Sequence, residues 1–318
     1  MRVLVTGGAG FIGSHVSDAL LDAGHAVIVL DDLSTGRREN VPARATFVEG
    51  DVRDAARIDA LFREHRPEVV CHQAAQTSVS VSTREPVRDA QINLVGSLEL
   101  LEACRTHGIA RFVFASTGGA IYGEVPDGRR ATESWPGQPL SPYACSKLAF
   151  EAYLAAYRRE HGITSTILRY ANVYGPRQDP HGEAGVVAIF SERLASGAPI
   201  RINARREPGD AGCVRDYVSV RDVVRANVLA IEGALSAPVL NVGTGRGTTT
   251  LELSEILARA LGASVILEHG PRRAGDIERS VLEPSAELTA LATPVSLEEG
   301  LTETARWFAS RHAASKSA

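Results

Sequence analysis

The sequence predicts an α/β fold in which a parallel, doubly wound sheet is followed by a smaller C-terminal α/β lobe. Three observations support this fold class. Short apolar, β-prone runs alternate with helical segments from residue 3 to about residue 168. A glycine-rich turn joins the first run to the first helix, and beyond residue 176 glycine, arginine and proline become frequent and the alternation lapses. Strands and helices that alternate in this way form parallel sheets covered by helices.

The composition is that of a globular protein with a moderate negative charge. The 318 residues include 44% hydrophobic and 23% charged residues, and the net charge is −4. That balance argues against a nucleic-acid or anionic-membrane binder. No apolar run reaches the roughly 20 residues needed to span a bilayer, and the N-terminal run breaks at glycines too early for a signal peptide. We therefore expect a cytoplasmic protein that binds neither nucleic acid nor membrane.

Four widely spaced cysteines indicate neither a disulfide framework nor a metal site. No Cys-x-x-Cys pair occurs among them. Zinc sites and small disulfide-stabilised domains require closer or more regular spacing. We expect each cysteine to be a small buried residue. The four are Cys71, Cys104, Cys145 and Cys213.

The first strand, residues 3–6, leads into a glycine-rich turn that opens a helix reaching about residue 24. Glycines occupy positions 7, 10 and 13, with Phe11 and Ile12 at the start of the helix. This is the sequence context of a Rossmann-type dinucleotide site, in which backbone N–H groups at a helix start meet a pyrophosphate. A glycine-rich turn alone is a weak signal. We expect Gly7, Gly10, Phe11, Ile12 and Gly13 to contact a dinucleotide.

The second strand, residues 26–30, ends in Asp31 and Asp32. An acidic residue at this position accepts hydrogen bonds from the adenosine ribose and repels a 2′-phosphate. The pair therefore favours NAD over NADP. Arg37 and Arg38 lie close by and could favour the phosphate, although arginines on a polar turn are more often solvated.

Two further strand ends supply candidate cofactor contacts. The third strand, residues 46–49, leads to Asp51 and Val52, where a carboxylate could meet the adenine amino group, and a helix then runs to about residue 65. The fourth strand, residues 68–72, runs into Gln73, Ala74 and Ala75, a stretch in which the small residues allow the backbone to approach a cofactor.

Residues 86–107 are predicted to form one long helix with an apolar periodic face. Asn93 lies inside it and could be a polar group near the cofactor; the alternative is a satisfied core amide. The fifth strand, residues 111–115, then ends in Ser116 and Thr117, whose hydroxyls sit at the edge where a substrate hydroxyl would lie.

Tyr143 and Lys147 form the most informative pair in the chain. Ser141 can cap a helix that begins at Pro142, and four-residue spacing places both side chains on one helical face. Of the 34 basic residues only Lys147 and Lys316 are lysines, and the others are arginines. A lysine at position 147 therefore indicates a specific need for an amine there. A nearby ammonium and a helix N-terminus lower the pKa of a phenol, and the ammonium can bind a ribose hydroxyl. The alternative is an incidental surface pair.

The strand at 164–168 completes the nucleotide-binding part. We expect this domain to span residues 1–176, with later segments at about 215–245 returning to it. A mainly substrate-binding lobe would span 177–311, with a helix from residue 251, a strand at 264–267 and a terminal helix. A disordered tail is expected over 312–318.

Together these motifs resemble the extended short-chain dehydrogenase/reductase family and, within it, the UDP-glucose 4-epimerases. The resemblance covers nearly the whole chain. Its motifs are TGGAGFIG from residue 6, the Asp31 strand end, STGGAIYGE from 116, Tyr143-x-x-x-Lys147, RYANVYGPRQ from 169, CVRDY from 213, NVGTG from 241 and PRRAGD from 271. Several motifs in the same order are more specific than any one of them.

The resemblance implies roles for the reactive residues. Tyr143 would be the base, Lys147 would bind the nicotinamide ribose, and Thr117 would supply a third hydroxyl, with Ser116 as the fallback. In many relatives the catalytic serine stands where this chain has Gly118. The related 4,6-dehydratases need an Asp-Glu pair after the threonine, and Gly118 and Gly119 here carry no acid.

The same resemblance implies a UDP-sugar site and a homodimer. Substrate contacts would fall on Asn172, Arg215, Arg273 and Asp276, and residues 185–190 would pack against uracil. Ser280 occupies a position where a bulky residue restricts substrates to plain hexoses, so N-acetylated sugars are expected to fit. The dimer would form through the helices at 86–107 and 143–160.

The expected activity is interconversion of UDP-glucose and UDP-galactose through a 4-keto intermediate with tightly bound NAD. The alternatives are a UDP-GlcNAc or UDP-glucuronate 4-epimerase, an oxidoreductase that consumes NAD, and an NAD-binding sensor or scaffold without catalysis. The presence of Tyr143 and Lys147 argues against a sensor or scaffold without catalysis.

Overall fold

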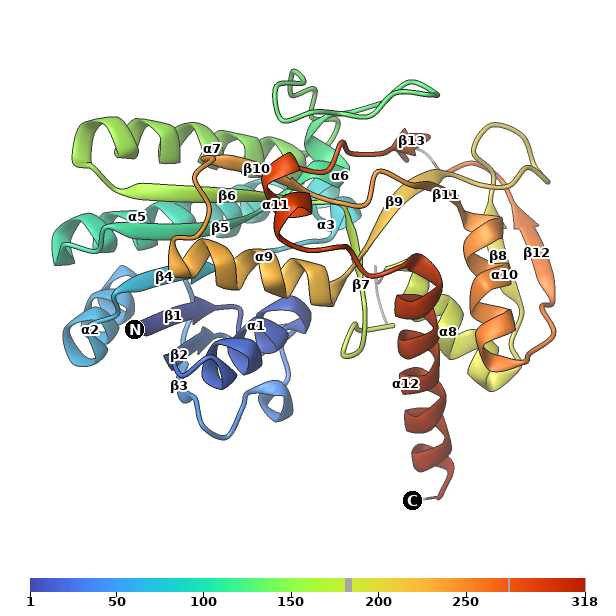
Figure 1. The fold of residues 1–318 in the computed structure, drawn as a ribbon, viewed down its shortest axis with the longest axis horizontal. Coiled ribbons are helices and arrows are strands. Elements are labelled where there is room, and N and C mark those ends of the chain that lie inside the picture. Colours follow the sequence, from blue (N-terminus) through green and yellow to red (C-terminus); the bar gives the residue numbers. More distant parts are fainter. Residues whose placement is uncertain (181–184, 274, 318) are drawn as a thin grey trace. The chain divides into compact units, whose positions relative to one another are not determined.

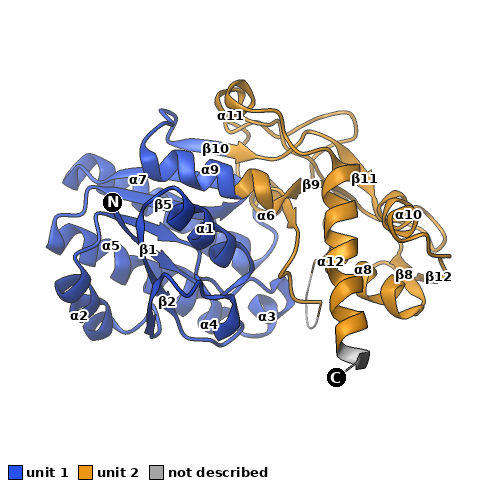
Figure 2. Cartoon of the chain, turned by 60° about the horizontal axis from the view of Figure 1, so that its bottom comes forward, with its two compact units in different colours: residues 1–117, 139–169, 224–240 blue, residues 118–138, 170–223, 241–318 orange. Residues whose placement is uncertain are grey.

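The computed structural model describes residues 1–180, 185–273 and 275–317, which divide into two compact units (Figure 2). Unit 1 comprises Met1–Thr117, Pro139–Arg169 and Val224–Leu240, and unit 2 comprises Gly118–Gln138, Tyr170–Val223 and Asn241–Ala318. Residues 118–138 and 170–176, which the sequence assigns to the first domain, thus group with unit 2. The later segment in unit 1 is 224–240, shorter than the 215–245 expected.

A seven-stranded sheet forms the centre of unit 1, in the order β10-β6-β5-β4-β1-β2-β3 (Figure 1). The pairs of β1 with β2 and β4, of β2 with β3, and of β4 with β5 are parallel. Strand order reverses between β1 and β4, which is where doubly wound sheets bind nucleotides. The strands are β1 Arg2–Thr6, β2 Ala26–Asp31, β3 Thr46–Glu49, β4 Val69–His72, β5 Arg111–Thr117, β6 Thr164–Tyr170 and β10 Val239–Val242.

Helices α2, α5 and α7 contribute to one continuous apolar core with the sheet. This core includes Phe62 of α2, Leu100 of α5 and Phe150 of α7, together with Phe112 and Phe114 of β5. The inner strands are buried along nearly their whole length, as expected for a parallel sheet covered on both faces. The helices and short turns of this part are α1 Phe11–Asp22, η1 Arg38–Asn40, α2 Ala55–His65, α3 Val79–Arg84, α4 Pro86–Ala90, η2 Gln91–Val95, α5 Gly96–His107, α7 Pro142–His161 and α9 Val220–Glu232.

The long helix predicted for residues 86–107 is interrupted. A π-helical turn, η2, separates α4 from α5. Asn93 lies within this turn and directs its amide to Gln76 and Asp89. Single π-helical turns inside α-helices are rare and occur frequently at functional sites.

Unit 2 has its own core and two smaller sheets. Strand β9 pairs with β7, β11 and β13, and β12 pairs with β8. Helices α8, α10 and α12 share a core that includes Phe190, Leu257 and Leu301. The elements are α6 Gly118–Ile121, β7 Asn172–Tyr174, α8 Val186–Ser196, β8 Ile200–Asn203, β9 Val214–Ser219, β11 Gly247–Thr249, α10 Thr250–Leu261, β12 Leu267–Gly270, β13 Arg279–Ser280, α11 Ala286–Leu291 and α12 Leu297–Ser317.

Two expectations for this part differ from the structure. The strand predicted at 264–267 is β12, which begins at Leu267. Helix α12 continues to Ser317, beyond residue 312, where a disordered tail is expected. Ala313 and Ala314 have high helix propensity, which favours continuation of the helix.

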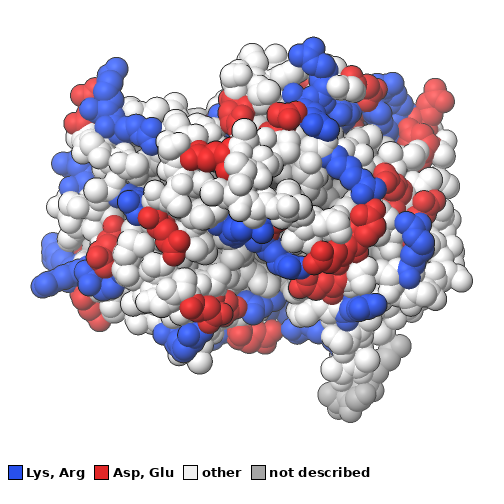
Figure 3. Space-filling model, in the orientation of Figure 1, with Lys and Arg blue, Asp and Glu red and all other residues white. Residues whose placement is uncertain are grey.

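On the face shown in Figure 3, basic and acidic side chains are interspersed. This distribution agrees with the small net charge. Within the ranges that the structure describes, none of the helices is both long and apolar enough to cross a membrane.

Candidate active site

The glycine-rich turn after β1 is closely packed against its surroundings. Gly7 has φ +68°, and a Cβ there would lie 2.7 Å from the Ala74 nitrogen; a Cβ on Gly13 would lie 2.2 Å from the Gly7 oxygen. Helix α1 then begins at Phe11 with no side-chain cap at Gly10 and no acidic residue in its first turn. The leading N–H groups at Phe11 and Ile12 therefore suit an anion such as a pyrophosphate.

At the end of β2, Asp31 is buried and its carboxylate holds two loops. Its Oδ2 accepts from the Ala9 N–H and its Oδ1 from the Leu33 N–H, each at 2.9 Å. Burial raises the pKa of Asp31, and the two backbone donors partly offset this. Asp32 is exposed and accepts from the N–H and hydroxyl of Ser34. Asp31 thus shapes the glycine turn, while Asp32 remains accessible to a ribose.

The two nearby arginines are engaged with neighbouring side chains. The Arg38 guanidinium lies 4.5 Å from the centre of the Phe47 ring, and Arg37 pairs with Glu39 at 3.9 Å. Both are exposed. Cation–π stacking and pairing of this kind are ordinary for surface arginines, so these contacts do not indicate a 2′-phosphate site.

Asp51 and Val52 follow β3 as expected. The Asp51 carboxylate is paired with Arg53 of the same turn, and this hydrogen bond holds the pKa of Asp51 below its usual range. Val52 is buried, and a Cβ on Gly96 would lie 2.9 Å from its side chain. Asp51 is only partly buried, so it stays available to an adenine amino group.

The loop after β4 is tied to the glycine turn and to the π-helical turn. Ala74 donates its N–H to Thr6 Oγ1 at 3.2 Å, and the Gln73 side chain donates to Asn227 at 2.8 Å. The Asn93 Oδ1 accepts from Gln76 N at 2.9 Å. Both N–H groups of Asn93 are also used within the protein, so it is the satisfied core amide and it positions this loop. Ala75, next in the loop, is partly buried.

Strand β5 resolves which of the two hydroxyls faces Tyr143. Thr117 lies beside the Tyr143 hydroxyl and lowers the pKa of that phenol. Ser116 is buried and donates to Glu151. Neighbouring side chains on a strand point to opposite sides, and both residues follow that alternation. The geometry therefore joins Thr117, and not Ser116, to Tyr143.

Lys147 lies one turn after Tyr143, at 3% exposure. Its ammonium donates to the Ala115 carbonyl at 2.9 Å and lies 4.7 Å from the centre of the Phe114 ring. Burial lowers the pKa of Lys147 to about 8, and the carboxylates of Asp89 and Glu151 partly oppose this shift. The amine is therefore mostly protonated at neutral pH.

The expected lowering of the tyrosine pKa is not found in the protein alone. Burial raises the pKa of Tyr143 to about 12, the hydrogen bond to Thr117 lowers it partly, and the Asp89 charge raises it further. Desolvation disfavours the charged phenolate, and the Lys147 ammonium is directed to Ala115. Ionisation at neutral pH therefore requires a further positive charge near the ring.

A buried ion pair beneath this edge was not predicted from the sequence. The Glu151 carboxylate pairs with Arg169 at 2.6 Å, with side-chain exposures of 6% and 11%. Glu151 continues the four-residue spacing of Tyr143 and Lys147 along α7, which places it on the same face. That spacing is the signal that could have revealed it.

Unit 2 holds the residues expected to bind the substrate. Asn172 begins β7 and is partly buried. Arg215 of β9 is in register with Ser280 of β13, and its Nη1 donates to the Val214 carbonyl at 3.1 Å. Ser280 is 2% exposed. The structure thus brings Arg215 and Ser280 together on adjacent strands.

Arg273 and Asp276 lie on the connection between β12 and β13. Arg273 is exposed, and the Asn203 amide oxygen, in the orientation that satisfies both groups, accepts from its Nε at 2.9 Å and its Nη2 at 3.2 Å. Asp276 is partly buried, and its N–H donates to the Arg273 carbonyl at 3.3 Å. In the stretch 185–190, Val187 and Phe190 are buried in the core of unit 2.

Cys145 is the cysteine that departs from expectation. All four cysteines are free, and Cys71 and Cys104 are buried. Cys145 is exposed on α7, and Cys213 is partly exposed beside Arg215. The prediction of four buried cysteines is therefore wrong for Cys145, because the reactive side chains occupy the opposite, buried face of α7.

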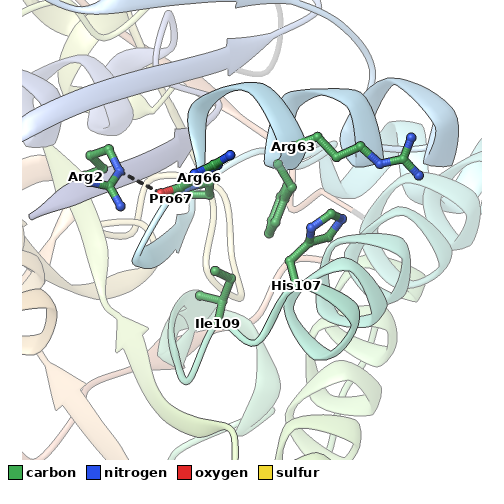
Figure 4. A pocket seen from close by; sticks show the side chains of 7 residues that line it. Arg2, Arg63, Arg66, Pro67, His107 and Ile109 are labelled. Atoms are coloured by element: carbon green, nitrogen blue, oxygen red, sulfur yellow. Dashed lines mark hydrogen bonds between the residues drawn. The ribbon is translucent and has the colours of Figure 1, made fainter.

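A separate cavity of about 530 Å³ lies near the amino ends of β1, β4 and β5 (Figure 4). Two of its three arginines have acidic partners: Arg63 pairs with Asp59 at 2.7 Å, and Arg2 with Glu68. Basic residues at the ends of α2 and α5 also complement helix dipoles. The predicted site residues of unit 1 lie at the other, carboxyl ends of these strands.

The residues of unit 1 fit a dinucleotide. The uncapped start of α1, the closely packed Gly7 and the exposed Asp32 match a pyrophosphate and a ribose. Tyr143 and the buried Lys147 lie on α7, and Lys147 bonds to Ala115 near the carboxyl end of β5. These features place candidate redox chemistry at the carboxyl edge of the sheet.

Known proteins resemble this chain over nearly its full length. Residues 3–243 match the NAD dependent epimerase/dehydratase family. A UDP-glucose 4-epimerase of Mycolicibacterium smegmatis is 45% identical, covering 97% of this chain and 98% of its own length.

Two crystal structures have closely similar folds. One is the Thermus thermophilus UDP-glucose 4-epimerase in complex with NAD, at TM-score 0.93 and 55% identity, covering 97% of this chain and 99% of its own. The other is the Thermotoga maritima UDP-glucose 4-epimerase with UDP-glucose, at TM-score 0.91 and 48% identity, covering 98% and 100%. The chain therefore belongs to the NAD dependent epimerase/dehydratase family.

Proposed function

We propose that this protein is a UDP-hexose 4-epimerase that interconverts UDP-glucose and UDP-galactose with tightly bound NAD. The observation that carries the proposal is that Tyr143 and the buried Lys147 share one face of α7, with Thr117 of β5 beside the Tyr143 hydroxyl. Relatives at 45% to 55% identity over nearly the whole chain are UDP-glucose 4-epimerases, which supports the same activity here.

In this mechanism Tyr143 carries the proton and Thr117 holds the reacting oxygen. Tyrosinate 143 removes the proton of the sugar 4-hydroxyl and later returns it, so the proton balance over one cycle is zero. NAD, held by the glycine-rich turn, Asp32 and Lys147, would supply a positively charged ring and a reversible hydride acceptor for C4 of the sugar. The 4-keto intermediate turns over between these two events, so no net oxidation occurs.

The cofactor requirement explains the electrostatics of Tyr143. Burial alone holds its pKa near 12, where the phenol is neutral and a poor base at neutral pH. An added positive charge favours the phenolate. We therefore expect Tyr143 to become basic only in the NAD-loaded protein. Lys147, with its pKa lowered to about 8, provides the ammonium that would bind the nicotinamide ribose.

For the nucleotide part of the substrate we propose Asn172, Arg215, Arg273 and Asp276 of unit 2. Paired arginines bind a diphosphate in a bidentate manner. The exposed Arg273 and the partly buried Arg215 remain accessible to such a ligand. Ser280, next to Arg215 in the sheet, would admit an N-acetyl group because its side chain is small. UDP-GlcNAc is accordingly a proposed second substrate.

Other reactions of the family are less well supported. Gly118 and Gly119 supply no carboxyl group after Thr117, so elimination of water from the sugar lacks an acid. A UDP-GlcNAc or UDP-glucuronate 4-epimerase would use the same unit 1 residues and differ only in unit 2. An oxidoreductase or a non-catalytic sensor would not require the return of the proton by Tyr143.

We further propose a homodimer formed by α4, α5 and α7. Large apolar side chains on α4, on α7 and on the turn η2, which leads into α5, are exposed, with Val87 at 69%, Val95 at 47% and Tyr153 at 43%. Apolar surface of this kind favours association. Sedimentation analysis of a Tyr153→Arg variant would show a shift to monomer. The cytoplasmic location remains a prediction, which cell fractionation would test.

One experiment separates the candidate functions. Purified protein is incubated, without added NAD, with UDP-glucose, UDP-N-acetylglucosamine or UDP-glucuronate, and the anomeric signals are followed by NMR. We expect conversion of UDP-glucose to UDP-galactose to continue past one equivalent of protein. Conversion that required stoichiometric NAD would indicate an oxidoreductase, and none with any sugar would contradict the proposal.

A further inference from the structure

A fully buried histidine lies at the point where the strand order of unit 1 reverses. His72 ends β4, next to β1, and is 1% exposed. Its Nδ1 lies 2.7 Å from Thr6 Oγ1, and its Nε2 lies 2.8 Å from Ser97 Oγ. The ring stacks on Phe114 and meets Phe112 and Phe150 edge-on. Both ring nitrogens are thus occupied inside an apolar core.

The hydrogen bonds around His72 determine its tautomer. A hydroxyl has one hydrogen, and Ser97 donates its hydrogen to the Asn93 carbonyl at 2.7 Å. Ser97 must therefore accept from His72 Nε2–H. Nδ1 then accepts from the Thr6 hydroxyl, which itself accepts from the Ala74 N–H. Burial, and secondarily the Lys147 charge, lowers the pKa of His72 to about 3, so the ring stays neutral.

The same chain of hydrogen bonds continues to the helix that carries Tyr143. The side chain of Asn93 donates to Gln76 O at 2.8 Å and to Asp89 Oδ1 at 2.9 Å. Asp89 is fully buried, and its Oδ2 accepts from Ser146 at 2.7 Å. Ser146 directly precedes Lys147. The π-helical turn η2 contains Asn93, the residue that connects the two halves of the chain of bonds.

We propose that His72, as the neutral Nε2–H tautomer, is a positioning residue. Through its hydrogen bonds it fixes the position of the glycine-rich turn relative to helix α7. One arm ends at Thr6, the residue directly before Gly7. The other runs through Ser97, Asn93 and Asp89 to Ser146. This inference rests on the proposed function, because it assigns each arm a consequence for cofactor retention or turnover.

The tautomer itself can be measured without any activity. In protein labelled with ¹⁵N-histidine, two-dimensional correlation of ring nitrogens with ring protons identifies the protonated nitrogen of His72, with a His72→Gln sample for assignment. We expect a protonated Nε2 and an unprotonated Nδ1 between pH 6 and 8. A protonated Nδ1, or a ring protonated on both nitrogens, would overturn the inference.

Three substitutions separate the two arms. The amide of His72→Asn overlaps Nδ1 and keeps the bond to Thr6, whereas the amide of His72→Gln reaches the place of Nε2 and keeps the donor to Ser97. His72→Phe keeps the ring and loses both bonds. The matched control is Phe62→Leu, which perturbs the same core away from these bonds.

The two arms have different expected readouts. For His72→Gln we expect NAD retention after purification to fall roughly 10-fold while kcat at saturating NAD changes little. For His72→Asn we expect the reverse, a kcat roughly 10-fold lower with NAD retained, because misplaced groups near the reacting atoms slow turnover. For His72→Phe we expect both NAD retention and kcat to fall, and for Phe62→Leu we expect neither to change.

The remaining outcomes are also decisive. If His72→Phe retained cofactor and turnover like the wild type, the positioning role would be refuted. Equal losses in the Asn and Gln variants and in Phe62→Leu would reduce His72 to a packing residue and refute it as well. If His72→Phe fails to fold, the positioning role is tested by the Asn and Gln variants and by the measured tautomer. A wild-type protein that retains NAD but lacks epimerase activity would refute the proposed function alone, since the tautomer and NAD retention remain measurable.

Discussion

The two units differ in how firmly the protein alone holds its candidate functional side chains. In unit 1, Lys147 and Glu151 are almost fully buried and each has a partner within the protein, and Tyr143 lies beside Thr117. In unit 2, Arg273 is exposed with the Asn203 amide as its partner, and Arg215 is only partly buried and donates to the carbonyl of the preceding residue. A reactive group must be held closely to its working geometry, whereas a diphosphate contact can be completed by the ligand.

This contrast predicts that changes in unit 1 affect turnover or stability, and that changes in unit 2 affect binding. Buried polar groups leave a desolvated partner behind when one member is removed. Removing an exposed arginine leaves its former partner in contact with water. The following substitutions are arranged by the size of the effect expected.

The largest effect is expected for Tyr143→Phe. Removing the hydroxyl eliminates the proton carrier and leaves the ring in place, so kcat should fall by roughly 10²- to 10⁴-fold or more. NAD retention should be nearly unchanged, because Lys147 keeps its bond to Ala115. Turnover by NMR and bound NAD by absorbance would be measured on one preparation. Retained turnover would remove Tyr143 from the mechanism.

Breaking the buried ion pair tests whether unit 1 depends on its internal partners. Glu151→Leu leaves the Arg169 guanidinium buried without its carboxylate, and we expect the free energy of unfolding to fall by about 3–5 kcal/mol. The control is the double variant Glu151→Leu/Arg169→Met, which should recover most of the loss in urea unfolding. A single variant as stable as the wild type would show that the pair is not needed for the fold of this unit.

For unit 2 we expect a change in affinity without a change in stability. Arg273→Ala removes one charged donor from an exposed position and should weaken UDP binding by roughly 10- to 100-fold in calorimetry. Its midpoint in thermal unfolding should match that of the wild type. The matched control, Arg272→Ala, alters the neighbouring exposed arginine. Equal losses in both variants would point to a general charge effect instead of a specific contact.

The smallest effect is expected for Ser280→Tyr. A large side chain beside Arg215 should exclude an N-acetyl group and reduce the ratio of UDP-GlcNAc to UDP-glucose turnover by about 10-fold. Ser280→Ala, which stays small, serves as the control. An unchanged ratio in the tyrosine variant would mean that another residue sets the sugar preference.

Local patterns in the sequence predicted most of unit 1. Each strand of its sheet from β1 to β6 was expected near its observed position, because parallel strands are short apolar runs between helices. The interruption at η2 was not predictable, since it depends on Asn93 bonding to Gln76, seventeen residues away in the chain.

Residues of the candidate site were predictable only where they lie on the same helix or strand, so that their spacing in the sequence places them together. Tyr143 and Lys147 lie on a single helix, so their spacing revealed them. Arg169, Asp89 and His72 are brought to the site by separate elements, and the bonds of His72 to Thr6 and Ser97 span strands and helices far apart in sequence. The raised pKa of Tyr143 also escaped prediction, because burial is a property of the folded chain.

The central claim is that the hydride removed from C4 of the sugar is returned to C4 within the same active site. UDP-glucose carrying deuterium at C4 tests this most directly, with the product examined by mass spectrometry and NMR. We expect UDP-galactose that retains the deuterium at C4, with none released to water or to free cofactor. Loss of the label to solvent, or its accumulation in free NADH, would contradict the account.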